Sequence, residues 1–108
     1  MESLNLENLG ADLQHEFAGH LAADVDMRLH MLVSEVGELA KEVVKARAYG
    51  TRPFAVTDGF KEELGDVLCD LALLAEAANV SLSECAELTV TKIRRRLAER
   101  GHVGSETA

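Results

Sequence analysis

The chain has 108 residues, of which 47% are hydrophobic and 4% aromatic, and its formal net charge is -8 at pH 7. This size fits one domain with a single core, which we place at residues 1–100, followed by a small polar tail at 101–108 that we expect to be disordered. The acidic excess argues against binding nucleic-acid polymers, whose phosphates need a basic surface. Because the sequence shows no membrane-span run and no secretion-signal pattern, we expect a cytoplasmic protein that does not enter membranes.

Low aromatic content and a single proline favour helices over strands. The first predicted helix covers about residues 3–22, where leucines recur at helical spacing, and we expect it to cover the open side of a hairpin formed by the next two helices. It offers Phe17, His15 and His20 as candidate ligand contacts. The favoured alternative is that Phe17 packs in the core and both histidines face solvent, because an aromatic residue at helical spacing usually packs.

The second and third predicted helices form an antiparallel hairpin. The second runs to about residue 49, where a Gly-Thr-Arg-Pro break at 50–53 ends it, and the third runs from about 60 to 79. The candidate caps are Asp24 or Asp26 for the second helix and Thr57 or Asp58 for the third. A loop of this length joins antiparallel neighbours. Its residues most able to touch a ligand are Tyr49, Arg52 and Phe54, although anchoring of the loop explains Phe54 equally well.

The fourth predicted helix begins with a capping box, Ser81-Leu82-Ser83-Glu84, and runs to about residue 100. Its second half holds the basic cluster of the chain: Lys92, Arg94, Arg95, Arg96 and Arg100. Lys92 and Arg96 are four residues apart, so we predict that both point at an acidic groove and hold phosphate oxygens. The structural alternative is that these cations complement the dipole at the end of the helix.

Each helix of the hairpin contains the same short motif, Glu35-Val36-Gly37-Glu38 in the second and Glu63-Leu64-Gly65-Asp66 in the third. Acids three residues apart project from one face, so antiparallel packing of the two helices brings four carboxylates together. Such carboxylates repel one another, and a hard divalent ion, Mg2+ or Mn2+, removes that conflict. The alternative is a pair of solvated acidic faces without metal. We interpret Gly37 and Gly65 as allowing the two backbones to approach closely.

Further charged residues and two cysteines lie near these motifs. Glu42 and Asp70 occupy matching positions. Asp70 can hydrogen-bond a metal ligand or an arginine from another helix, and Glu42 is a similar candidate for a role at the site. Arg28 lies two turns before the first acid on the same face, where it can reach a phosphate or brace an acid. Cys69 and Cys85 lack the spacing of a redox or metal motif, and we interpret both as reduced packing residues.

The sequence EVGELAKE, followed later by EELGDVLCDLALLAE, resembles the MazG-like branch of the all-α nucleoside triphosphate pyrophosphatases. The resemblance covers roughly residues 27–100. The resemblance implies an all-α, four-helix MazG-like bundle built on the hairpin. It also implies a Mg2+-dependent enzyme that hydrolyses a (deoxy)nucleoside triphosphate to the monophosphate and pyrophosphate, a chemistry suited to nucleotide-pool house-cleaning. The implied metal and catalytic residues are Glu35, Glu38, Glu63 and Asp66. Family members have a lysine at the position of Lys92 and Asn or Arg at that of Arg96, whereas Ser34 replaces a frequent second glutamate.

Broad apolar stripes on the last three helices exceed what one chain of four helices buries, so we predict a homodimer or a dimer of dimers. The rival interpretation is a non-catalytic acidic module that binds a metal or a partner. A carboxylate di-iron bundle needs Glu-x-x-His, and no histidine follows these acids at that spacing. The sequence leaves open the base, the choice between triphosphate and diphosphate, and the carboxylate that activates water.

Overall fold

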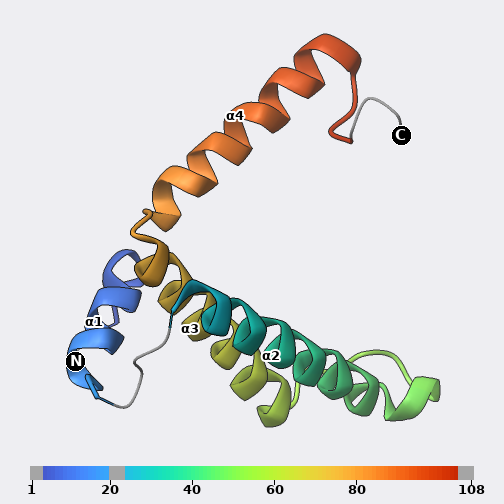
Figure 1. Ribbon diagram of the computed structural model, residues 1–108. Coiled ribbons are helices and arrows are strands. Elements are labelled where there is room, and N and C mark those ends of the chain that lie inside the picture. Colours follow the sequence, from blue (N-terminus) through green and yellow to red (C-terminus); the bar gives the residue numbers. More distant parts are fainter. Residues whose placement is uncertain (1–3, 20–23, 105–108) are drawn as a thin grey trace.

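The computed structural model describes residues 4–19 and 24–104, and every regular element within them is a helix (Figure 1). The elements in chain order are the short 3-10 helix η1 (Leu6–Asn8), α1 (Leu9–Glu16), α2 (Val25–Ala46), the 3-10 helix η2 (Ala48–Gly50), α3 (Asp58–Ala78) and α4 (Leu82–Arg100). The predicted all-α fold class and the four predicted α-helices are confirmed. None of the helices in this part of the chain combines the length and the apolarity that a membrane span needs.

The starts of the three long helices are fixed by side-chain caps. Asp24, Thr57 and Ser81 each take an extended backbone conformation and accept a hydrogen bond from the backbone N–H three residues later, at 2.9, 3.0 and 3.2 Å respectively. Each bond satisfies one of the donors that a helix N-terminus leaves unpaired. These caps confirm one alternative of each predicted pair and the predicted start of α4.

Two helices are shorter than predicted. α2 ends at Ala46 because Ala48, Tyr49 and Gly50 all take left-handed backbone conformations, with φ of 45°, 57° and 89°. The first helix was predicted over residues 3–22, but α1 ends at Glu16, and η1 precedes it. Residues 3 and 20–22 lie outside the described residues, so the ends of that prediction are not addressed.

α2 and α3 pack side by side as an antiparallel hairpin, and α1 lies against the C-terminal half of α3 (Figure 1). The predicted hairpin is therefore confirmed, while the first helix covers α3 rather than both partners. The small buried core lies mainly where these helices meet, and its apolar members are Leu9, Ala46, Ala72, Leu73 and Ala75. α1 approaches α3 closely because residue 10 is glycine: a Cβ there would lie 2.4 Å from the carbonyl oxygen of Ala72.

Gly10→Ala is expected to destabilise the protein by about 1–3 kcal/mol, because the added methyl group meets backbone that cannot turn aside. Gly37→Ala is the matched control. It adds the same methyl group inside α2 with nothing within 4 Å, so we expect a gain of up to about 1 kcal/mol in the free energy of unfolding. Denaturant unfolding of both variants measures the difference, and a Gly10→Ala variant as stable as the wild type would contradict the described packing of α1.

The predicted roles of the two motif glycines are wrong for the hairpin. A Cβ added at Gly37 or Gly65 would have no atom within 4 Å, so neither glycine marks a close approach of α2 and α3. The close contact instead lies at Gly59, where a Cβ would lie 2.6 Å from Oε2 of Glu42. This contact joins the Glu42 side chain of α2 to the backbone of α3 near the loop end of the hairpin.

α4 extends away from the hairpin instead of packing beside it as the fourth member of a bundle (Figure 1). No residue of α4, all of which is described, is buried. The Cα radius of gyration is 17.1 Å, whereas a compact chain of this length has about 13 Å. At the start of the helix the Ser83 hydroxyl donates a hydrogen bond to the carboxylate of Glu7, which lies in η1. Within one chain, α4 therefore lacks an extensive packing partner.

Candidate metal and nucleotide site

Three of the four predicted metal ligands converge between the helices of the hairpin. Glu35 of α2 and the pair Glu63 and Asp66 of α3 each present one carboxylate oxygen, and these oxygens lie within 4.8 Å of one another. The i, i+3 spacing places Glu63 and Asp66 on the same face of α3, and the antiparallel packing of α2 brings Glu35 to them. The structure therefore brings together three of the four carboxylates that were predicted to converge.

Glu38, the fourth predicted ligand, does not belong to this group of three. Its side chain is 49% exposed, and it forms an ion pair with Lys41, with Nζ and Oε1 3.5 Å apart. Its negative charge still acts on Glu63 across the hairpin, where it raises the pKa of that carboxyl. An exposed ion pair of this kind contributes little stability, so Glu38 can leave Lys41 at small cost when a stronger cation is present.

The surroundings of Glu63 disfavour its charged form. Its Oε2 atom is buried without a hydrogen-bond partner. Burial is the main cause that raises the pKa of Glu63, followed by a hydrogen-bonding interaction with the Glu35 carboxyl and by the charges of Asp66, Glu35 and Glu38. A buried oxygen without a partner is costly, and either a proton or a cation relieves it.

The three carboxylates fit a hard divalent ion by both chemistry and distance. Mg2+ binds oxygen at about 2.0–2.1 Å, so two oxygens on the same ion lie at most about 4 Å apart. The observed limit of 4.8 Å requires only small movements of flexible side chains. The unpartnered Oε2 of Glu63 gives such an ion an oxygen that has no competing hydrogen bond.

Asp70 lies one turn after Asp66 on α3 and feels the same group of acids. Burial, then the charges of Glu35 and Asp66, raise its pKa, while the positive charge of Arg28 acts in the opposite direction. Burial and the charges of Asp66 and Asp70 also raise the pKa of the Cys69 thiol, so the thiol stays protonated. Cys69 therefore fits the predicted packing role.

The metal-free protein is expected to lose stability as the pH rises through and above the range in which ordinary carboxyl groups ionise. The pKa values of Glu63 and Asp70 are raised by the fold, so over this range the folded state binds more protons than the unfolded state, and the free energy of unfolding falls with pH. Thermal melts in EDTA measure this trend, and Asp70→Asn should flatten it. Mg2+ should reverse it, because ionised carboxylates bind the ion. Melting temperatures in EDTA that climb over this range would contradict the described burial of these acids.

Residues 25–100 match the MazG nucleotide pyrophosphohydrolase domain. The chain belongs to the MazG family. A curated relative is the uncharacterized protein YpjD of Bacillus subtilis (strain 168), which is 39% identical over 72 residues. The matched segment covers 64% of this chain and 63% of YpjD, so it spans less than two thirds of that relative. No solved structure matches the chain significantly. The family description names a nucleotide pyrophosphohydrolase, which is a hydrolase.

In this MazG domain Glu42 has a place away from the acid group. Its carboxylate lies against Gly59 in the first turn of α3 and forms an ion pair with Lys45 at 3.3 Å. A negative charge near a helix N-terminus is favourable, because it faces the positive end of the helix dipole. Glu42 therefore lies half-buried between the loop ends of α2 and α3.

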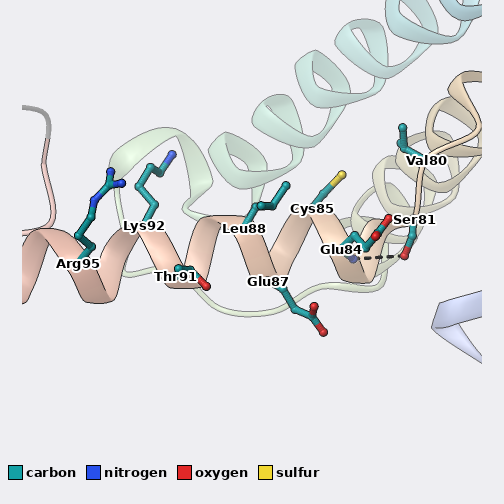
Figure 2. Close-up of a pocket in the computed structure, with 9 residues that line it drawn as sticks. All are labelled: Val80, Ser81, Glu84, Cys85, Glu87, Leu88, Thr91, Lys92 and Arg95. Carbon is teal, nitrogen blue, oxygen red and sulfur yellow. Dashed lines mark hydrogen bonds between the residues drawn. The ribbon is translucent and has the colours of Figure 1, made fainter.

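The two predicted phosphate ligands of the MazG domain are not brought to the acids within one chain. Figure 2 shows Cys85, Leu88 and Lys92 on one side of α4, where they line an open groove of about 600 Å³. Arg95 lines the same groove. Arg96 instead donates a hydrogen bond from Nη1 to the Val103 carbonyl oxygen, at 3.2 Å. Cys85 is exposed, so its predicted packing role is wrong for the single chain.

The remaining candidate residues lie in η2, in the loop that follows it and around α1. Phe54 packs edge-to-face on Phe60, with ring centroids 5.1 Å apart, and Arg52 donates from Nε to the Ala46 carbonyl oxygen at 3.2 Å. Both residues therefore stabilise the loop of the MazG domain. Tyr49 is 76% exposed.

Phe17 is exposed, so its predicted core packing is wrong, because it caps the end of α1 instead of lying within the helix. His15 is exposed, as the solvated alternative predicted. His20 lies outside the described residues.

Proposed function

We propose that this MazG domain hydrolyses the α–β phosphoanhydride bond of a (deoxy)nucleoside triphosphate and releases the monophosphate and pyrophosphate. The observation that carries the proposal is the convergence of Glu35, Glu63 and Asp66, within 4.8 Å, in a chain of a pyrophosphohydrolase family. The proposal includes Mg2+ as the ion, with Mn2+ as a substitute, because both prefer oxygen ligands. It also includes a cytoplasmic location, where both free cysteines stay reduced.

In this proposal the position of each acid determines its role. Glu35, Glu63 and Asp66 hold the ion, and Glu38 joins them when it releases Lys41. When bound, a divalent ion neutralises phosphate charge and lowers the pKa of the attacking water. A carboxylate oxygen that is not engaged by the ion accepts the proton of that water. Hydrolysis of modified nucleotides by this route would make the protein a house-cleaning enzyme.

The proposed enzyme is a homodimer or a dimer of dimers, in which a second copy completes each site. The outer face of α3 carries an apolar groove of about 460 Å³, lined mainly by Leu64, Val67, Leu68 and Leu71. On α4, Leu88 is 73% exposed beside Lys92. The basic half of α4 complements the acids of the hairpin, and the extended chain leaves both surfaces uncovered. Association would place α4 of one copy, with Lys92 and Arg96, against the acids of the other.

A substrate panel tests the proposal. The purified protein is incubated with ordinary and modified (deoxy)nucleoside triphosphates and diphosphates in the presence of Mg2+, and release of pyrophosphate or phosphate is measured. We expect pyrophosphate release from at least one triphosphate and loss of that release in EDTA. The absence of release from every substrate would instead support the non-catalytic acidic module.

A further inference from the structure

Arg28 is the one buried charged side chain among residues 4–19 and 24–104, with 2% of its surface exposed. Its Nη1 atom donates only a long contact to the sulfur of Met31, at 3.8 Å. Its Nη2 atom is buried and has no hydrogen-bond partner. A buried cation with so few partners is costly unless negative charge nearby compensates it. Negative charge is therefore expected near Arg28.

The neighbouring charges are those of the acid group. Arg28 lies seven residues before Glu35, which places both on the same face of α2. Across the hairpin its positive charge acts on Asp70, against the effects of Glu35 and Asp66. The ion pairs of the described chain involve Lys41 and Lys45, not Arg28. The charge of the guanidinium thus acts on Asp70 without a direct ion pair.

We propose that Arg28 is a positioning residue: a permanent internal counter-ion, acting chiefly through Asp70, that keeps the acids of the hairpin together when no divalent ion is bound. Three carboxylates converge between α2 and α3, Asp70 lies one turn after Asp66, and the fixed charge of Arg28 offsets part of the repulsion that Asp70 experiences from Glu35 and Asp66. The inference rests on the proposed function, because it describes the state of the metal site before the ion arrives.

Contact with substrate phosphate does not explain Arg28 as well. Its buried Nη2 cannot meet a ligand without opening of the hairpin. As a cation it also repels a divalent ion, so it adds nothing to metal affinity by charge alone. The stability that the charge of Arg28 contributes must therefore appear in the metal-free protein and decrease when Mg2+ is bound. This difference separates a counter-ion from a residue that only fills space.

The test measures thermal unfolding of the full chain in EDTA and in saturating Mg2+. Arg28→Met keeps most of the side-chain volume and removes the charge. We expect it to lower the melting temperature in EDTA by about 5 °C or more, and by much less in Mg2+. Arg28→Lys, which keeps the charge, should retain most of the stability. In an Asp70→Asn background the loss caused by Arg28→Met in EDTA should shrink, because the main partner charge is already absent.

Arg47→Met is the matched control, because it removes the same charge from the exposed end of α2 and should leave the difference between EDTA and Mg2+ unchanged. A loss for Arg28→Met that is equal in EDTA and Mg2+, or failure of that variant to fold even with Mg2+, would show a packing role and overturn the inference. Full additivity with Asp70→Asn would also overturn it. A wild-type protein that does not respond to Mg2+ would overturn both this inference and the proposed function.

Discussion

Glu63→Gln is expected to reduce pyrophosphate release by more than about 100-fold, since even the indirect partners of metal ligands change activity by about 10–100-fold. Glutamine keeps the shape of the side chain but lacks the anionic oxygen that Mg2+ binds. Glu63 is the best position for this test because its oxygen belongs to the converging group and its Oε2 is buried without a partner. The rise in melting temperature caused by Mg2+ should disappear in the same variant.

The stability of Glu63→Gln distinguishes a lost ligand from a damaged fold. The fold raises the pKa of Glu63, so the charged form is disfavoured there, and a neutral side chain should leave the metal-free protein at least as stable as the wild type. Glu62→Gln is the matched control on the adjacent, exposed position of α3, and it should keep both activity and the Mg2+ response. Equal activity of the two variants would remove Glu63 from the proposed site.

Leu68→Asp is expected to convert the protein to monomers and to remove most of its activity. Leu68 lines the apolar groove on the outer face of α3. An aspartate buried there by a second copy would lack a partner, and a penalty of about 3 kcal/mol or more corresponds to association weakened by more than about 100-fold. Activity falls in parallel because the proposed site uses α4 of the other copy. Sedimentation velocity at micromolar concentration, combined with the pyrophosphate assay, measures both effects.

Val56→Asp is the control for that experiment. Val56 is also an exposed apolar residue, but it lies in the loop between η2 and α3, away from the groove. The variant should therefore keep its assembly and its activity. Wild-type protein that sediments as a monomer, or a Leu68→Asp variant that remains assembled, would contradict the proposed dimer.

The parts of the structure that local patterns determine were predictable. Asp24, Thr57 and Ser81 have short polar side chains immediately before apolar, helix-periodic runs, and all three are caps. Glu63 and Asp66 share one face of α3 because their i, i+3 spacing fixes the direction in which they project. A pattern of this kind needs no knowledge of distant contacts.

Other features depend on neighbours that the sequence does not reveal. Gly37 and Gly65 look like sites of close backbone approach, yet Gly10 has that role, because propensity records the cost of a glycine and not what lies beside it. Arg28 could be placed on the face of Glu35, but its burial depends on how α3 packs. The apolar stripe of α4 likewise does not specify whether the helix packs within its own chain or against another.

The isolation of α4 in the single chain has a consequence for the formation of the proposed dimer. A helix of 19 residues with little support from its own subunit is only marginally stable in water, even with Ser81 and Gly101 at its ends. In a freshly synthesised subunit this segment would fray and reform many times before it meets a second molecule. Acquisition of its final shape and pairing of the subunits would then be one event, governed by how much protein the cell contains.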